Sequence, residues 1–377
     1  MSKTIYSHLA AGLIFGFGLA CGGAETPQKF LGANSCASSS CHGGGGAKQN
    51  QFLVWSLKDF HSQRPAATLT TARSRQIADA LDTKDPAADA RCTTCHAPLH
   101  AVPENLRGEN FKVSEGVSCE SCHGPAENWL RAHTRTDYTR ADRTAAGMRD
   151  LQDLYVRANL CVACHQNVDA DILKAGHPEL IFELDGQSVA EPKHWRVEKN
   201  GNGAQAWLVG QAVALREMSW QLSQSHGMAD LSQRLSETNL VDRIFAVSWV
   251  LRKATADERM VQRFPEDFES IKNWADKLAR EKADAVWTEP MTRDCLTRLA
   301  SLASSFSGTE MRRSLQARRA ERLVLALDRL VAALPELKNN EPVQSALNQL
   351  FQLAQSVPDF DPKQFATALE SFSTATR

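Results

Sequence analysis

The sequence lacks an excess of charge of either sign, because 43 Lys and Arg residues stand against 44 Asp and Glu residues. A polybasic nucleic-acid binder needs clustered surplus Lys and Arg, so nucleic acid is excluded as a first-choice partner. With 42% hydrophobic and 23% charged residues, the composition is ordinary for a globular protein and argues against wholesale disorder. The 377 residues are too many for one small core and predict two domains.

Long apolar runs are also scarce, and the one candidate lies near the start of the chain. A stretch of apolar or small residues from Leu9 to Ala20 follows a short basic segment. It has the form of a secretory signal and is too short for a transmembrane helix of about 20 residues. We therefore predict a signal peptide over residues 1–24 and export to the periplasm. Two alternatives stay open for Cys21: lipidation after lipoprotein-type cleavage, or removal by ordinary cleavage near Ala24.

Cysteine is almost absent from the second half of the chain. Nine of the ten Cys residues lie within the first 164 residues, and nine of the eleven His residues precede residue 178. We therefore predict a cysteine-rich domain over residues 25–200 and a chemically different domain over residues 201–377, with Gly201 and Gly203 marking the boundary. The late cysteine, Cys295, is expected to be a buried free thiol on a helix.

The early cysteines form a repeated unit in which two thiols are followed directly by a histidine. Three copies have the spacing C-x-x-C-H, and the first unit has four residues between its thiols. The units are Cys36-Ala-Ser-Ser-Ser-Cys41-His42, Cys92-Thr-Thr-Cys95-His96, Cys119-Glu-Ser-Cys122-His123 and Cys161-Val-Ala-Cys164-His165. In c-type haem sites the two thiols add to the vinyl groups of haem and the next His ligates the iron. The repeats thus predict four covalently attached haem c groups.

The other uses of paired cysteines fit this pattern less well. A zinc site needs four converging ligands and would not require a His after every pair. A thioredoxin-like motif would occur once, in a βαβ setting. Disulfides within each pair are compatible with export but leave the repeated His unexplained.

Additional histidines can supply the second axial ligand of each iron, because Met148 is the only competing Met in the haem region. We predict four of them as distal ligands: His61, His133, His177 and His194. Trp129 and His133 would share one face of a helix that begins near Pro125, and His61 would end a helix that carries aromatic residues.

Two further histidines fit ligation less well. His100 lies too close to His96 to reach the opposite face of the same haem, although it could serve another haem. His226 is expected to cap a helix end or to lie on the surface.

As a set, these motifs resemble the tetrahaem cytochromes of the cytochrome c-554 (cytochrome c-552/4 domain) family. The resemblance covers about residues 30–200 and is carried by the motif order, the segment from Cys119 to His133, and Ala175-Gly-His-Pro-Glu-Leu-Ile-Phe-Glu-Leu184. It implies a mostly helical haem domain with haems in stacked pairs. It also implies three haems with two His ligands and one five-coordinate haem, attached at Cys92 and Cys95, with His133 as distal ligand of the first haem. The wider first motif and the additional His194 depart from the family pattern.

The second half of the chain predicts helices without a cofactor motif. Apolar residues recur at helical spacing over 204–222, 241–254, 265–286, 290–305, 309–333, 343–356 and 362–373. We expect a helical bundle with solvated arginines, in which the stripe Leu323, Leu325, Leu327, Leu330 and Val331 is buried. The alternative is a docking surface for a partner protein. The predicted fold class is therefore mainly α, with a multihaem domain that has little regular sheet followed by a helical bundle.

The leading functional hypothesis is an exported cytochrome that carries electrons between redox partner proteins through four haems, by Fe(III)/Fe(II) cycling. Two alternatives stay open. One is a haem enzyme that reduces a small nitrogen oxide or peroxide at a five-coordinate iron. The other is an electron-transfer subunit that its helical domain docks to a membrane-associated respiratory complex. The sequence does not decide whether the protein is an enzyme.

Overall fold

A computed structural model describes residues 27–62, 64–195, 202–225, 231–257, 267–308, 311–355 and 358–377. The proposed signal segment with Cys21, and the candidate cap His226, lie outside these residues. Among the described helices, none is both long and apolar enough to cross a membrane. The described residues form helices and loops without a sheet, and one isolated bridge joins Phe30 to Arg107. The predicted mainly α fold is confirmed.

The chain divides into two compact units, Met1–Arg149 and Asp150–Arg377. This division lies about 50 residues before the boundary that we predicted near residue 200. The reason is that residues 150–190 pack into the second core, where Ala158, Val162, Phe182 and Leu184 are buried together with the later helices. The fourth Cys-His unit therefore belongs to the second structural unit.

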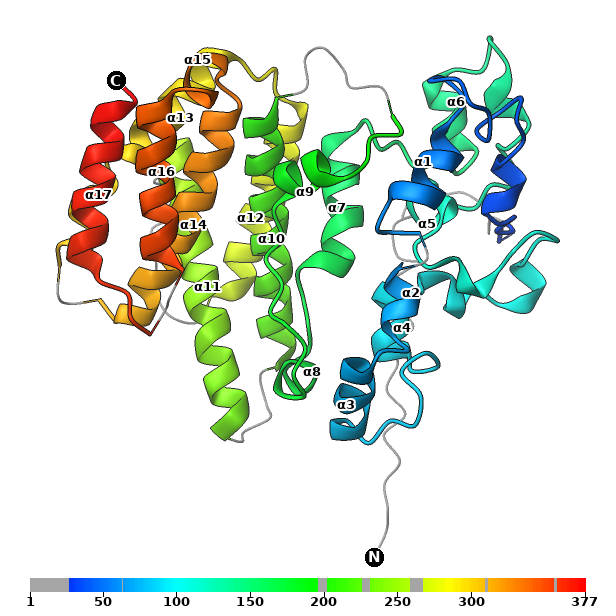
Figure 1. The fold of residues 1–377 in the computed structure, drawn as a ribbon, viewed down its shortest axis with the longest axis horizontal. Helices are drawn as coiled ribbons and strands as arrows, with labels where there is room; N and C mark the ends of the chain where they lie inside the picture. The colour runs from blue at the N-terminus through cyan, green and yellow to red at the C-terminus, as the bar shows by residue number, and fades with distance from the viewer. Residues whose placement is uncertain are drawn as a thin grey trace, which may run out of the picture. The chain divides into compact units, whose positions relative to one another are not determined.

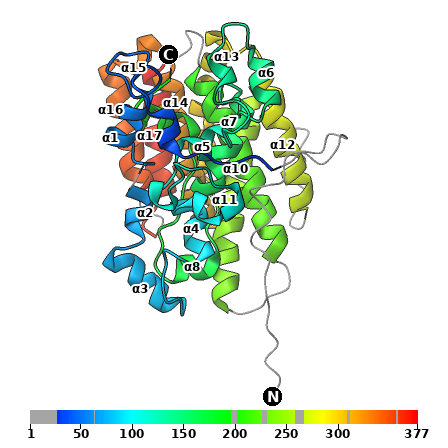
Figure 2. The same cartoon turned by 90° about the vertical axis from the view of Figure 1, so that its right-hand side faces the viewer.

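The first unit consists of short helices joined by long loops (Figure 1), and these helices share no common direction (Figure 2). Its buried apolar cluster consists of Phe30, Leu99 and Val102, with Leu106 and Phe111 packed against it, while Trp55, Leu69 and Trp129 are buried outside the cluster. The α-helices are α1 (Gln51–Lys58), α2 (Arg64–Thr68), α3 (Ala72–Ala80), α4 (Ala90–His96), α5 (Cys119–His123) and α6 (Arg140–Ala145). The 3-10 turns are η1 (Ala33–Cys36), η2 (Pro98–Ala101), η3 (Glu104–Leu106), η4 (Val113–Glu115) and η5 (Ala132–Thr134).

Local sequence signals explain where these short helices begin and end. The side chain of Thr139 accepts a hydrogen bond from Asp142 N, and Asp142 bonds back to Thr139 N, which makes a capping box at the start of α6. Gly124 ends α5 with φ at 85°, and a Cβ at this position would lie 2.6 Å from the carbonyl oxygen of Gly147. A side chain therefore cannot replace the glycine that follows the third Cys-His unit without a backbone shift.

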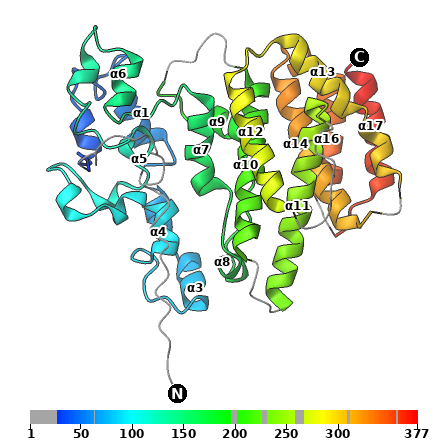
Figure 3. The same ribbon diagram turned by 180° about the vertical axis from the view of Figure 1, so that it is seen from behind.

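The second unit is a bundle of longer helices around one large core (Figure 1). Helix α10 packs against α7, α9, α11 and α12, and Figure 3 shows α12 beside α10 from behind. The helices are α7 (Leu154–His165), α8 (Ala170–Lys174), α9 (Leu184–Ala190), α10 (Gly203–Ser225), α11 (Leu231–Thr255), α12 (Phe268–Asp284), α13 (Glu289–Ala300), η6 (Leu302–Phe306), α14 (Arg313–Ala332), α15 (Pro335–Lys338), α16 (Glu341–Ala354) and α17 (Pro362–Ala375). The predicted helices of the second half are confirmed.

Helix α14 confirms one expectation and corrects another. Its apolar stripe is buried within its own unit, with Leu323, Leu327 and Leu330 fully inaccessible and Leu325 half-buried. The arginines on its other face were expected to be solvated, but Arg318 and Arg322 have side chains only 13% and 1% exposed. They are accommodated because Glu321 and Glu179 place carboxylates beside them.

Cys295 on α13 is buried and reduced, as predicted. Its thiol donates a hydrogen bond to the carbonyl oxygen of Ala254 over 3.1 Å. Burial raises the pKa of this thiol above its ordinary value. We therefore assign Cys295 a packing role.

Candidate functional site

Three of the four Cys-His units occupy the last turn of a helix. They end α4, α5 and α7, so that the histidine is the final helical residue in each case. Polar caps fix the other ends of α4 and α7, where Asp89 accepts from Arg91 N over 2.8 Å and Asp153 accepts from Val156 N over 3.0 Å. Because residues three apart lie on one helix face, each C-x-x-C spacing presents its two thiols to the same side.

The first Cys-His unit has wider spacing between its thiols, and the additional residues close into a tight turn. The amide of His42 donates to Cys36 O over 3.3 Å, and the amide of Cys41 donates to Ser38 O over 2.9 Å. These bonds bring the backbone of His42 back to Cys36 despite the two additional residues. The departure from C-x-x-C-H is therefore accommodated within the loop.

Five of the predicted iron ligands have Nδ1 beside an oxygen. The distances from Nδ1 are 3.0 Å for His42 to Gln51 Oε1, 3.1 Å for His61 to Asp59 Oδ1, 3.1 Å for His96 to Pro65 O, 3.2 Å for His133 to Trp129 O and 2.8 Å for His177 to Pro178 O. Carbonyl and carboxylate oxygens only accept, so Nδ1 carries the hydrogen and Nε2 presents its lone pair. This tautomer is the one that a metal-ligating histidine with a hydrogen-bonded outer partner adopts.

The rings of His42 and His133 lie near each other in the first structural unit, Met1–Arg149. Their ring centroids are 6.1 Å apart, and their planes differ by 14°. A histidine nitrogen lies about 2 Å from a bound transition metal, and its ring centre lies roughly 1 Å farther out, so two axial imidazoles have centroids about 6 Å apart. The centroid separation of the proximal ligand of the first motif and its predicted distal partner therefore equals that of two imidazoles on one iron, and their rings are near-parallel and stacked.

The segment that carries His133 differs from the helix that we predicted. Residues after Pro125 form turns followed by η5, although the amide of His133 still donates to Trp129 O over 2.9 Å. The predicted neighbour relation holds, because the rings of Trp129 and His133 make an edge contact at 5.5 Å. Likewise, α1 ends at Lys58, so His61 lies in the turn beyond it.

His61 is held by a buried carboxylate. Asp59 is only 3% exposed, and its Oδ1 accepts from both the amide of His61 over 2.8 Å and its Nδ1 over 3.1 Å. A carboxylate behind a ligating imidazole fixes the ring and increases its basicity. Leu57 and Phe60 flank this turn with 75% and 62% of their surfaces exposed.

Two buried glutamates join the first and third Cys-His units. Glu120 accepts hydrogen bonds from the amides of Leu31, Gly32 and Ala126 over 2.8, 2.7 and 2.7 Å. Glu115 accepts from the amide of Ala33 over 3.1 Å and from the hydroxyl of Ser118 over 2.8 Å. Burial raises the pKa of Glu120, although the three amides favour its ionised form.

As a result of these contacts, the first thiols of the first and third Cys-His units, Cys36 and Cys119, are neighbours. A hydrogen bond between Cys36 and Cys119 is the main cause that lowers the pKa of Cys36 and raises that of Cys119. Sequence reasoning missed both glutamates. The position of Glu120 between the two cysteines of the third unit was the available signal.

Replacing Glu120 with Gln is expected to destabilise the haem-loaded protein by about 3 kcal/mol, because one oxygen and an amide group cannot accept from three backbone donors. Glu127 provides a matched control: it is exposed and accepts from the amide of Lys29. Glu127→Gln should change the unfolding free energy by less than about 0.5 kcal/mol. Denaturant unfolding of both variants checks this, and equal stabilities would contradict the anchoring role.

The second structural unit, Asp150–Arg377, carries the fourth Cys-His motif together with His177 and His194. His177 lies between α8 and α9, in a segment without regular structure. The ring of His194 makes an edge contact with Trp195, with centroids 5.1 Å apart. Burial raises the pKa of Cys161 to about 11.

The residues of the first unit fit covalently bound haem. The imidazoles of His42 and His133 have the centroid separation of two ligands of one metal ion. Leu57 and Phe60 present apolar surface beside His61, as a planar apolar macrocycle requires. The small cluster around Leu99 is also far less than a unit of this length needs if protein side chains alone form its core.

Comparison with known proteins supports the same chemistry. Residues 35–124 match the family model described as cytochrome c554 and c-prime. No curated protein and no solved structure matches the chain. The matched segment contains the first three Cys-His units and ends one residue after His123. The predicted resemblance is confirmed over this segment, which is similar to the cytochrome c554 and c-prime family of c-type cytochromes.

Proposed function

We propose that the protein is an exported c-type cytochrome that carries electrons between redox partner proteins through four covalently bound haems. The observation that carries the proposal is the pair His42 and His133, with ring centroids 6.1 Å apart and Nδ1 of each ring hydrogen-bonded. An iron with an imidazole on both faces has no open position for a substrate, which favours electron transfer over catalysis at that haem.

The haems supply reversible one-electron chemistry at iron when they are attached. The chain would hold them through thioethers at the cysteine pairs Cys36 and Cys41, Cys92 and Cys95, Cys119 and Cys122, and Cys161 and Cys164. The proximal ligands would be His42, His96, His123 and His165, and the distal candidates are His61, His133, His177 and His194. Outer partners such as Asp59 and Gln51 keep the ring orientations fixed as the iron changes charge.

Export and anchoring belong to the same proposal. The segment over residues 1–24 would direct the chain to the periplasm, where Cys21 would either be lipidated or be removed with the signal peptide. Edman or mass analysis of the mature N-terminus separates these two outcomes.

The haem number and the spin states test the function. Intact mass with a pyridine haemochrome assay is expected to give four haems per chain. A count of three haems would contradict haem attachment at Cys36 and Cys41. Electron paramagnetic resonance of the oxidised protein is expected to show low-spin haems with two His ligands. A high-spin signal from one haem, together with turnover of a nitrogen oxide or peroxide, would favour the enzyme alternative. Wholly low-spin spectra would exclude it.

A further inference from the structure

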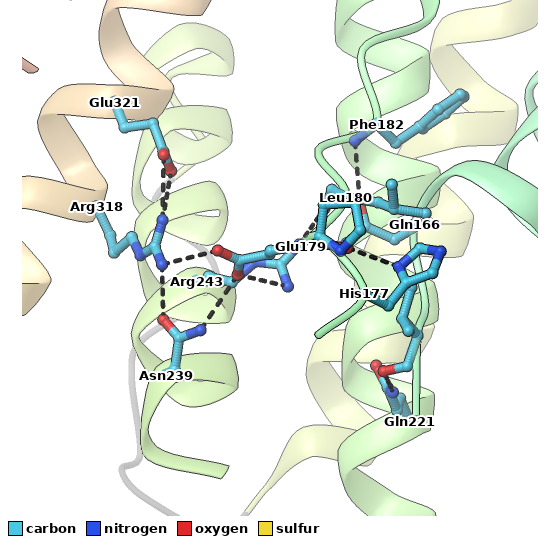
Figure 4. A network of polar contacts seen from close by, with 12 residues as sticks. Gln166, His177, Glu179, Leu180, Phe182, Gln221, Asn239, Arg243, Arg318 and Glu321 are labelled. Carbon is cyan, nitrogen blue, oxygen red and sulfur yellow. Dashed lines mark hydrogen bonds and ion pairs between the residues drawn. The ribbon is translucent and has the colours of Figure 1, made fainter. Parts of the chain in front are cut away.

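The loop of residues 176–183, here named the His177 loop, has no regular structure yet is held at many points. Figure 4 shows its polar groups converging on residues of the surrounding helices. Glu179 accepts hydrogen bonds from Arg318 Nη2 over 2.9 Å and from Asn239 Nδ2 over 3.2 Å, and its Oε1 pairs with Arg243 Nη1 over 2.9 Å. One carboxylate therefore joins the loop to α11 and α14 at once.

The backbone of the loop is fixed by the same set of helices. Arg243 Nη2 donates to the carbonyl oxygen of Leu180 over 2.7 Å, and Gln211 Nε2 on α10 donates to that of Phe182 over 2.8 Å. The side chain of Phe182 is fully buried in the core of the second unit. The loop thus has an apolar anchor and two carbonyl anchors in addition to Glu179.

Helix α10 also holds the chain just after the fourth Cys-His unit. Asn167 Nδ2 donates to Glu217 O over 3.0 Å, and Gln221 Nε2 donates to Val168 O over 3.0 Å. Gln166 Oε1 accepts from the amide of Phe182 over 3.4 Å, which ties this exit segment directly to the His177 loop. The exit of the fourth motif and the His177 loop are therefore fixed to one set of helices.

We propose that α10, α11 and α14 form a platform that positions His177 for axial ligation of a haem iron, with Glu179 as the positioning residue. This inference rests on the proposed assignment of His177 as a ligand. An imidazole on an irregular loop loses much conformational freedom when it binds iron, and prior fixation of the loop removes most of that cost. The haem-free helices thereby have a function: they hold the ligand loop of the cytochrome.

The arginine contacts of Glu179 are buried, which makes them strong enough for this role. The side chain of Arg243 is 6% exposed and that of Arg318 is 13% exposed. Charge-assisted hydrogen bonds in such surroundings are stronger than exposed ones, and the loss of one partner leaves a buried guanidinium without its acceptor. Glu179→Gln should therefore loosen the loop rather than merely change surface charge.

The test uses the full-length haem-loaded protein and carbon monoxide, which binds reduced haem only when a distal ligand leaves. His177→Ala gives the reference for complete ligand loss. Glu179→Gln is expected to bind carbon monoxide at one haem at least about tenfold faster than the unaltered protein, with a matching loss of low-spin signal. Glu289→Gln is the control, since Glu289 also pairs with an arginine, Arg293, over 3.0 Å, but lies exposed on α13, outside the platform. Its rate should stay within about twofold.

The outcomes distinguish a failure of the ligand assignment of His177 from a failure of the positioning platform. If His177→Ala gains no carbon monoxide binding, His177 is not a ligand and the assignment under the proposed function fails. If His177→Ala gains binding but Glu179→Gln does not, the platform is overturned. If Glu179→Gln fails to assemble with its full haem content, Gln211→Leu removes only the donor to Phe182 O and is expected to accelerate binding about threefold. An unchanged rate in that variant would also overturn the platform.

Discussion

Full-length protein produced without haem attachment is expected to keep amide protection in α10 to α17 while the described residues of the first unit exchange freely. The second unit buries one large apolar core that reaches from Ala158 to Phe372. The first unit has a buried cluster of three residues around Leu99. Burial contributes about 25 cal/mol per Å² of apolar surface, so this cluster, even together with the buried Trp55, Leu69 and Trp129, cannot offset the ordering of more than a hundred residues.

Hydrogen exchange followed by mass spectrometry measures this difference peptide by peptide. The haem-free protein is made by replacing all eight motif cysteines with Ser, and the haem-loaded protein serves as the control in which both units are protected. Helix α7 provides an internal comparison, because it carries the fourth motif but packs against α10. Strong protection of residues 27–149 without haem would show that side chains alone fold the first unit.

His133→Ala is expected to convert one low-spin haem per molecule into a high-spin haem. With its ring centroid 6.1 Å from that of His42, His133 is the proposed second ligand of the first motif's iron, so its removal should leave that iron with one imidazole. Its reduction potential should rise by about 0.1 V, a fraction of the roughly 0.8 V range that axial ligands span. Spectroelectrochemistry and electron paramagnetic resonance measure the two effects.

The control for this prediction is His100→Ala. His100 is an exposed histidine of the same unit, four residues after His96. Its removal should leave spin states and potentials unchanged, whereas added imidazole should restore the low-spin signal in His133→Ala. Four unaltered low-spin haems in His133→Ala would refute the assignment of His133.

The sequence was sufficient for those features that depend on local spacing. The Cys-His units, the position of Cys295 and the helices of the second half follow from patterns within a few residues of one another. The anchoring contacts do not, because Glu120 bonds the amide of Gly32 across 88 positions and Arg318 bonds Glu179 across 139. No periodicity in a single sequence specifies such pairs.

The domain boundary illustrates the same limit. The change in composition near residue 200 is real, but it marks where the Cys-His units and nearly all of the histidines end. The structural division instead follows packing, since Phe182 and Leu184 are buried with α10 rather than with the first three motifs. Cofactor chemistry and core packing thus divide this chain at different residues.

The hydrogen bonds of Glu120 also have a consequence for the order of assembly during synthesis. The amides of Leu31 and Gly32 are made almost 90 residues before the carboxylate that holds them. Because a chain is synthesised from its N-terminus, the segment with Cys36 and Cys41 emerges before its anchor exists. The first pair of thiols is therefore in open chain and accessible to haem attachment before the third motif closes the fold around it.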